Sequence, residues 1–383
     1  MAEIKRLSPH YRAGPLPHRT NAAYQALRRD IPKLNDEQVY ARMSQVIGTL
    51  DANHTMFRRL PGTEVQSDFE RYLPVKFYVF PEGVFIVDAE PGHEDLIGKR
   101  LLSIGRTPAD EAFRKVASAL SIGHDMEAYW IAPTRMTEVH LLHGLGIVPA
   151  TEAVTLSLAG ADGTVISRVL RTDSNDTLSK LMAPRGVPTP LFLKRVPESH
   201  WFEAWPDKST VYVQFNQVID DKDETLPQFR LRLRRELDQR PVKNLILDLR
   251  HNNGGNTFNY AELMRTAIAF SAKEGNQLYV LIGRNVYSAA ANFTTDIERL
   301  GNPIFVGELT GNTGNQEGDE GQILLPYSGW RASVGAVWWQ LSSPWDKRRG
   351  IPPHVPVQLT AKAYFAGEDP VLDTVGKLIA QRS

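Results

Sequence analysis

The sequence contains no cysteine among its 383 residues, and this absence removes whole classes of chemistry. Without thiols the chain has no disulfide, no thiolate nucleophile, no cysteine-based zinc site and no iron–sulfur cluster. Any side-chain nucleophile must therefore be a serine, a threonine, a lysine or a carboxylate. Cysteine-free chains occur in oxidising and in reducing compartments, so this absence does not locate the protein.

The sequence also lacks an excess of charge of either sign, since 44 basic residues balance 44 acidic ones. A balanced chain carries no electrostatic footprint for nucleic acid or for an anionic membrane surface, and we expect neither partner. No run of about 18 apolar residues occurs, so we expect no membrane-spanning helix. The hydrophobic share of 42% is that of an ordinary globular protein.

Residues 1–21 are polar and contain several prolines, without the apolar segment of a signal peptide. A leader removed earlier would leave no trace, so we expect a soluble protein for which secretion or a periplasmic location stays open. The ten histidines form no cluster with carboxylates at metal-ligand spacing. We therefore expect no metal and no cofactor, and the sequence does not indicate an oligomeric state.

The first half of the chain predicts helices followed by strands. Apolar residues at helical spacing predict two helices within residues 20–50, and alternation predicts a hairpin over residues 75–87. Further helices are expected within residues 110–145, and a short β region over residues 154–169. A proline-rich stretch at residues 184–197 is typical of a linker. The length of the chain favours two or three domains.

The second half alternates strands and helices, which predicts an α/β sheet with helices packed against it. The tail, residues 322–359, returns to strand patterning. The alternating segments are strands at 210–215, 244–249, 278–282 and 304–306, and helices at 226–237, 258–270 and 288–300.

A glycine pair, Gly254 and Gly255, follows one of these strands in the run DLRHNNGG at residues 248–255. Paired glycines allow a sharp turn whose N–H groups can face an anion, either a phosphate or the oxyanion of acyl transfer. No Gly-Lys-Ser/Thr follows, so the turn is not a phosphate-binding Walker loop. Taken alone, the glycine pair is also explained by a sharp turn between a strand and a helix, with no functional role.

Ser288 occupies the other candidate turn, where a predicted strand gives way to a predicted helix in the run YSAA at 287–290. At this place its hydroxyl can be exposed, and the Ala289 N–H lies at the positive end of the helix dipole. Serine is also a common helix N-cap, which is the simpler interpretation of the same pattern.

A serine needs a base to become a nucleophile, and His54 is the best placed histidine. It lies in a cluster of capping-type residues that ends a predicted apolar helix. A histidine at a helix end also commonly has a structural role only.

Six segments together resemble the S41 family of serine peptidases, the C-terminal processing and tricorn-core group. They occur in the order of the family's motifs and cover the chain from about residue 45 to its C-terminus. The segments are LDANHT (50–55), DLRHNNGG (248–255), YSAA (287–290), VGELTG (306–311), LPYSG (325–329) and GEDPVL (367–372).

The resemblance implies a ClpP/crotonase-like core of β-β-α units, and so an α/β fold class. It implies an N-terminal helical subdomain at residues 1–70 and a PDZ-like or accessory β-rich domain with a linker at residues 71–200. The catalytic core would then occupy residues 201–383. Within the middle part, DLIGKRLLSIG at residues 95–105 is similar to a run found in PDZ modules.

The resemblance also implies how the serine is activated. Processing proteases of the family use a lysine some two dozen residues after the serine, but no lysine occurs between Ala289 and Asp346. The tricorn-like branch uses an N-terminal histidine, which His54 matches. In that scheme Asn53 is the polar neighbour that orients His54, and Asp346 is the late carboxylate.

Two further carboxylates, Asp51 and Glu308, compete with Asp346 for the acid role. Two positions depart from the family pattern, since Ala291 replaces a glutamate and His354 replaces an aspartate. Both departures bear on substrate positioning, and a weakened or repurposed member stays open.

The sequence therefore predicts a serine peptidase that acts on peptides or proteins. Ser288 would be the nucleophile and His54 the general base, with oxyanion donors from Gly254, Gly255 and Ala289. The alternative is a non-catalytic or weakened member that binds an apolar small molecule or peptide, for which seven tryptophans could supply a groove. A crotonase-like acyl-CoA enzyme is disfavoured, because no basic phosphate-binding cluster is visible.

Overall fold

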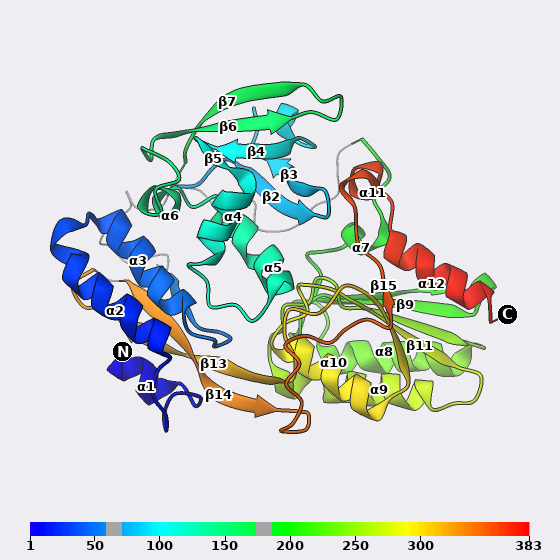
Figure 1. Cartoon of the computed structure of the whole chain (residues 1–383). Coiled ribbons are helices and arrows are strands. Elements are labelled where there is room, and N and C mark those ends of the chain that lie inside the picture. Colours follow the sequence, from blue (N-terminus) through cyan, green and yellow to red (C-terminus); the bar gives the residue numbers. More distant parts are fainter. Residues whose placement is uncertain (59–70, 174–185, 329, 383) are drawn as a thin grey trace. The chain divides into compact units, whose positions relative to one another are not determined.

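The computed structural model describes residues 1–58, 71–173, 186–328 and 330–382 (Figure 1). The chain forms two compact units. Residues Met1–Leu181 and Glu317–Trp338 make the first unit, and Met182–Gln316 and Trp339–Ser383 make the second. The division into residues 1–70, 71–200 and 201–383 stays a prediction. The return of residues 317–338 to the N-terminal unit was not among the sequence-based expectations.

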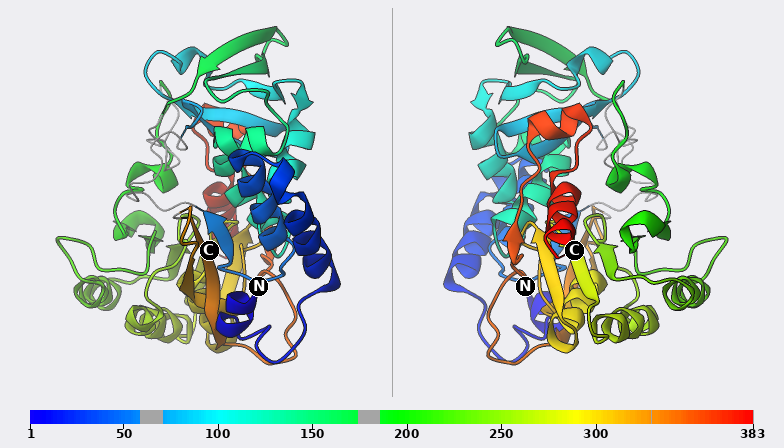
Figure 2. Two further views of the ribbon diagram at one scale, coloured as in Figure 1. Left: turned by 90° about the vertical axis from the view of Figure 1, so that its left-hand side faces the viewer. Right: turned by 90° about the vertical axis from the view of Figure 1, so that its right-hand side faces the viewer.

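The first unit contains two sheets. The larger is antiparallel, in the order β2-β3-β4-β6-β7 with β5 paired to β4, and the smaller has the order β1-β14-β13. Figure 2 shows β1, in blue, beside the brown and orange strands that come from the far end of the chain. The strands are β1 (Met56–Arg58), β2 (Val75–Phe80), β3 (Gly83–Ala89), β4 (Arg100–Ile104), β5 (Thr107–Pro108), β6 (Ala153–Ala159), β7 (Val165–Arg171), β13 (Asn315–Leu324) and β14 (Arg331–Gln340).

The helices α2 to α6 lie within or at the edges of the two predicted helical ranges, 20–50 and 110–145, whereas α1 at Ala2–Leu7 was not predicted. The Asn35 side chain accepts from the Gln38 N–H while the Gln38 side chain accepts from the Asn35 N–H, a capping box that starts the helix leading to His54. The helices are α1 (Ala2–Leu7), α2 (His18–Asp30), α3 (Asp36–Gly48), α4 (Ala109–Ala117), α5 (Asp125–Arg135) and α6 (Val139–Gly144), with short 3₁₀ turns at Ile31–Lys33 and Glu94–Leu96.

The predicted hairpin is confirmed as β2 and β3. The two strands pair antiparallel, and the tight turn between them is closed by the pair Phe80 and Gly83. The inward side chains of the hairpin join the core of this unit, together with Phe57 of β1 and Trp330, which directly precedes β14. The PDZ-like character of this region stays a prediction.

The second unit is built on one six-stranded sheet in the order β15-β12-β11-β10-β9-β8. All neighbours are parallel except β8 and β9, which are antiparallel. The strands are β8 (His200–Trp205), β9 (Thr210–Phe215), β10 (Asn244–Asp248), β11 (Gln277–Ile282), β12 (Pro303–Gly307) and β15 (Val355–Pro356).

Helices cover both faces of this sheet (Figure 1). Alternate residues of β9 point to opposite faces of the sheet. Val211 and Val213 pack with α8, α9 and α10 on one face, and Tyr212 packs with residues of α12 on the other. The helices are α7 (Leu191–Lys194), α8 (Leu226–Gln239), α9 (Ala261–Ser271), α10 (Ala289–Leu300), α11 (Ala361–Ala366) and α12 (Pro370–Ala380), with 3₁₀ turns η4 (Pro206–Lys208) and η5 (Thr257–Asn259).

The predicted α/β class is confirmed, and the strand–helix alternation of the second half falls close to its predicted places. Part of the predicted linker, residues 184 and 185, lies outside the described residues, and α7 occupies part of the remainder. Gly329 of the LPYSG motif also lies outside them. Among the described helices, none is both long and apolar enough to cross a bilayer.

Candidate active site

Ser288 sits in a strained turn between β11 and α10. Its backbone has φ 54° and ψ −128°, a conformation that residues with a Cβ seldom adopt. Although Ser288 is the N-cap residue of α10, its side chain makes no capping hydrogen bond to the helix. A serine that served only as a cap would use its hydroxyl there. The hydroxyl is therefore not used to stabilise the helix end.

The Gly254–Gly255 turn packs directly against Ser288. Both glycines have positive φ, 111° and 138°. A Cβ on Gly254 would lie 2.7 Å from the Ser288 Cβ and 3.0 Å from the Ala289 nitrogen. The two candidate turns that lie 34 positions apart in the sequence are thus in contact, and only glycine fits at this place.

The three predicted oxyanion donors differ in their hydrogen bonding. The Gly254 N–H donates to the Asn252 Oδ1 at 3.0 Å, so the turn itself already uses this amide. Within the described residues, no hydrogen bond engages the N–H of Gly255 or of Ala289. Ala289 is the first residue of α10. An N–H in this position has no partner inside the helix and lies at the positive end of the helix dipole.

His54 lies in the first unit, in the loop between α3 and β1, and its backbone is also left-handed, with φ 54°. The loop is held on both sides. The Asn53 N–H donates to Glu317 Oε2 at 3.2 Å, and the Gly335 N–H donates to Thr55 Oγ1 at 3.2 Å. Gly335 allows this approach, because a Cβ there would lie 2.8 Å from the Asn53 carbonyl oxygen.

The electrostatic surroundings of His54 come from strand β13. Burial lowers the pKa of His54 below its ordinary value, while the carboxylates of Glu320 and Asp319 and a hydrogen bond with the Glu317 backbone oppose that shift. A neutral imidazole at neutral pH is the form that can accept a proton. His54 is therefore kept in the state that a general base requires.

Strained backbone occurs at both the predicted nucleophile and the predicted base. Among the described residues, four that are not glycine have positive φ: His54, Ser209, Ser288 and Asp319. Two of these are the predicted base and nucleophile, and a third, Asp319, acts electrostatically on His54. Conformations of this kind cost about 1–3 kcal/mol each and cluster at functional sites.

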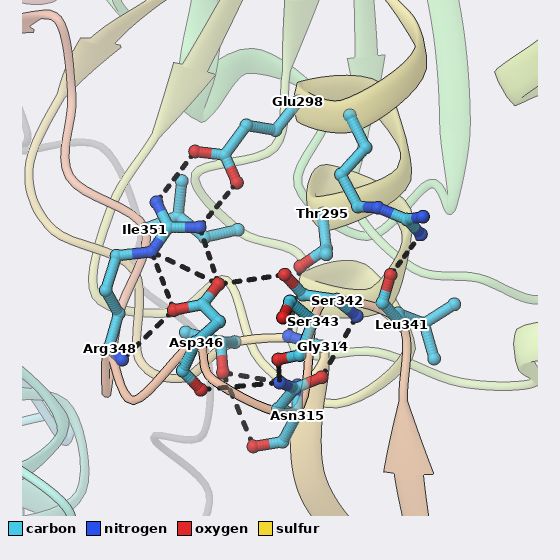
Figure 3. Close-up of polar contacts among 12 residues, drawn as sticks. Thr295, Glu298, Gly314, Asn315, Leu341, Ser342, Ser343, Asp346, Arg348 and Ile351 are labelled. Atoms are coloured by element: carbon cyan, nitrogen blue, oxygen red, sulfur yellow. Dashed lines mark hydrogen bonds and ion pairs between the residues drawn. The ribbon is translucent and has the colours of Figure 1, made fainter.

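Asp346 belongs to a polar network on the loop after β14 (Figure 3). Its carboxylate forms an ion pair with Arg348 at 2.8 Å and accepts a hydrogen bond from Ser342 Oγ at 2.9 Å. Arg348 also pairs with Glu298 of α10 through two hydrogen bonds of 2.8 Å. The hydrogen bonds from Arg348 lower the pKa of Asp346 to about 2, so this group stays ionised at any working pH.

The two competing carboxylates have different surroundings. Glu308 forms a bidentate pair with Arg284 of 2.7 and 2.9 Å, and both side chains are largely buried. Asp51 is exposed, and its N–H donates to the Tyr11 hydroxyl. Within the part of the chain that the structure describes, no group of three or more His, Asp or Glu side chains is arranged to hold a metal ion.

No protein-family model matches the sequence, and no curated protein matches it. Solved structures do match. Mature CPAF in complex with lactacystin gives a TM-score of 0.65 at 12% identity, over 94% of this chain and 92% of CPAF. Mature CPAF in another structure gives 0.63 at the same identity, over 94% of this chain and 91% of CPAF.

The chain shares the fold of CPAF. Weaker matches among solved structures include a putative S41 protease from Bacteroides fragilis, which is 13% identical over 100% of this chain and 97% of that one, with a TM-score of 0.45. They also include the photosystem II D1 C-terminal processing protease, which is 15% identical over 96% of both chains, with a TM-score of 0.44.

The two departures from the S41 sequence pattern have structural roles in this fold. Ala291 is fully buried in α10. The His354 Nδ1 accepts the Phe305 N–H at 2.9 Å, and the two rings stack with an angle of 4° between their planes. Replacing the family's two carboxylates at these positions therefore leaves no unpaired charge at either of them.

Sequence reasoning missed the polar residues around both candidate catalytic side chains. Glu317, Asp319 and Glu320 lie on β13 beside the His54 loop. Asn312 and Gln316 bond to the backbone of Ser288. The run NTGNQEGDE at residues 312–320 is conspicuously polar, but polarity alone is equally typical of an exposed loop.

Proposed function

We propose that this protein is a serine peptidase in which Ser288 is the nucleophile. The observation that carries the proposal is the turn at Ser288: a strained serine at a helix N-terminus, with its hydroxyl unused by the helix and a glycine turn packed on it. Turns of this kind expose a nucleophile next to backbone N–H donors.

The first chemical step follows from these groups. His54 takes the proton of Ser288 Oγ, and the oxygen attacks the carbonyl carbon of a peptide bond. The carbonyl oxygen becomes an oxyanion, which accepts hydrogen bonds from the N–H of Ala289 and of Gly255. We leave Gly254 N–H out of the oxyanion hole because it already donates to Asn252. The role of Gly254 is to leave room for Ser288.

The remaining steps release the two products. Protonated His54 gives its proton to the departing amine, and the amine leaves. A water molecule then attacks the acyl-enzyme with His54 again acting as base, which frees the new carboxyl end and restores Ser288. Each oxyanion donor is worth about 10²–10³ in turnover.

The acid that supports His54 is proposed to be Asp346, with Asn53 orienting the imidazole. The low pKa of Asp346 supports this role, because the group is negative at every pH where His54 can act as base. Glu320 and Asp319 supply a second negative field at His54.

A second candidate function is binding of an apolar molecule without catalysis. Phe258 is 81% exposed, lies just after the glycine turn, and contacts the Trp339 ring at 6.0 Å between centroids. Contiguous exposed apolar side chains mark binding surfaces. In a peptidase the same side chains would contact the substrate.

The experiment that separates the two functions is hydrolysis of fluorescently labelled, unfolded casein by the full chain. A peptidase releases fragments with the wild-type protein and none with Ser288→Ala. If the wild-type protein and Ser288→Ala release equally little, while an apolar dye binds both equally, the peptidase proposal is wrong and the binding function stands.

A further inference from the structure

Two buried amide side chains hold the backbone of Ser288 on both sides. The Ser288 N–H donates to Asn312 Oδ1 at 3.2 Å, and Gln316 Nε2 donates to the Ser288 carbonyl oxygen at 3.0 Å. The two amides also bond to each other, from Asn312 Nδ2 to Gln316 Oε1. Asn312 and Gln316 are 2% and 1% exposed, so water does not compete for these bonds.

The same polar chain continues to the glycine turn. Gln316 Nε2 also donates to Asn292 Oδ1 at 3.1 Å, and Asn292 Nδ2 donates to Thr257 Oγ1 at 3.0 Å. Thr257 begins η5, the short helix that follows Gly254 and Gly255 after one residue, Asn256. We call Asn312, Gln316, Asn292 and Thr257 the amide chain. It connects the backbone of Ser288 with the segment that carries the glycine turn.

The direction of every bond in the amide chain follows from Ser288. A backbone N–H only donates, so the Asn312 atom facing it is the oxygen. The Asn312 NH₂ group must then donate to Gln316, whose own NH₂ group faces the Ser288 carbonyl and Asn292. An amide rotated by half a turn would place two donors or two acceptors against each other, so the four side chains have one consistent arrangement.

We infer that the amide chain positions the nucleophile, by holding Ser288 in its strained backbone conformation and in register with the Gly254–Gly255 turn. This inference rests on the proposed serine peptidase function. A strained backbone conformation persists only where surrounding contacts hold it in place. The hydrogen bonds to the N–H and to the carbonyl oxygen of Ser288 are contacts of this kind. The amides act through the backbone of Ser288, so they are positioning residues.

The test compares two buried glutamines in one unit, each replaced by methionine. Gln316→Met removes the bonds donated to Ser288 and Asn292 and the bond accepted from Asn312. The matched control is Gln277→Met at the start of β11, whose side chain is 6% exposed and donates to the carbonyls of Leu278 and Asn302. Both variants lose two hydrogen bonds donated by a buried amide, and Gln316→Met also loses the one accepted from Asn312, but only Gln316→Met loses contact with Ser288.

We expect Gln316→Met to lower kcat for casein-derived peptides by about 10²-fold, because a shift of about 1 Å in a reacting group has an effect of this size. KM should stay within about twofold, and Gln277→Met should keep wild-type kcat. Thr257→Val is a milder variant at a half-buried position, and it should lower kcat by about threefold to tenfold by releasing Asn292.

The possible results separate the inference from the function on which it rests. Equal kcat values for Gln316→Met, Gln277→Met and wild type would overturn the positioning role while leaving the peptidase intact. A fall in kcat shared equally by both methionine variants, with equal losses in melting temperature, would also overturn it. If Gln316→Met does not fold, unchanged kcat in Thr257→Val decides against the inference. A wild-type protein without Ser288-dependent hydrolysis would remove the function, and the inference with it.

Discussion

A Cβ at Gly254 would lie 2.7 Å from the Cβ of Ser288, so the Gly254–Gly255 turn and the Ser288 turn are fitted to each other at van der Waals contact. Real Cβ atoms do not approach this closely. The contact makes the geometry of one turn depend on the other, although they follow different strands of the sheet.

Gly254→Ala should therefore abolish activity while leaving most of the fold. The methyl group must push Ser288 or the Ala289 amide aside, and its φ of 111° adds strain, which together lower the free energy of unfolding by about 1–3 kcal/mol. Gly275→Ala is the control, because Gly275 also has positive φ, 78°, but only the Lys243 side chain lies within 4 Å, at 3.6 Å. Equal activity of the two variants would contradict the account.

His54→Asn should separate the chemistry of His54 from its backbone conformation. Asparagine tolerates the left-handed φ that His54 adopts, so the free energy of unfolding should change by no more than about 1 kcal/mol. The variant has no base, so kcat should fall by about 10³-fold or more. Urea unfolding and casein hydrolysis measure the two effects. Loss of stability in step with activity would indicate a structural role only.

Glu320→Gln should shift the pH dependence of kcat/KM rather than abolish activity. The Glu320 carboxylate raises the pKa of His54, and burial lowers it. Removing that negative charge lowers the pKa of His54 further, so the acid limb of the profile should move to lower pH. Glu111→Gln, at an exposed ion pair on α4, is the control and should leave the limb in place. A shift to higher pH would contradict the electrostatic description.

Asp346→Asn tests the proposed acid, and its expected effect is a fall in kcat of about 10²–10⁴-fold at pH 7. Arg348→Met is the companion variant. It removes the ion pair but keeps the carboxylate, and should lower kcat less than Asp346→Asn does. If Asp346→Asn keeps full activity while a double variant of Asp319 and Glu320 loses it, the acid lies on β13.

The same carboxylate makes a prediction about stability. Arg348 lowers the pKa of Asp346 to about 2, below its unfolded value of about 4, so the stabilisation is complete above pH 4. It should be lost as the pH falls through about 2. The difference in unfolding free energy between wild type and Asp346→Asn, from urea titrations, should therefore shrink between pH 4 and pH 2. A difference that grows over this range would contradict the pairing.

The sequence predicted the second unit well because its strands are short apolar runs such as residues 245–249, separated by helices with clear capping signals. Thr225 and Gln228 form a capping box at the start of α8, for example. These signals are local. Pairing between distant segments has no such signal, so the sequence did not indicate that β1 pairs with β14, where Met56 lies opposite Ser333.

The residues of the candidate site likewise fall into those that a local sequence signal marks and those that it does not. Ser288, His54 and the glycine pair could be proposed from the sequence because each lies at a strand or helix end that the sequence marks, and because their order resembles a family pattern. The amide chain could not be proposed from the sequence, because Asn312 and Gln316 bond to the backbone of Ser288 and not to a side chain that a motif would mark. No pattern in the sequence distinguishes a buried amide from an exposed one.

The central claim is that Ser288 is a nucleophile activated by His54, and intact-protein mass spectrometry after treatment with a fluorophosphonate tests it most directly. We predict one phosphonyl adduct on wild type, located on the peptide that contains Ser288. It should form at least 10²-fold more slowly in His54→Asn and not at all in Ser288→Ala. An unmodified wild-type protein, or an adduct that persists in Ser288→Ala, would contradict the claim.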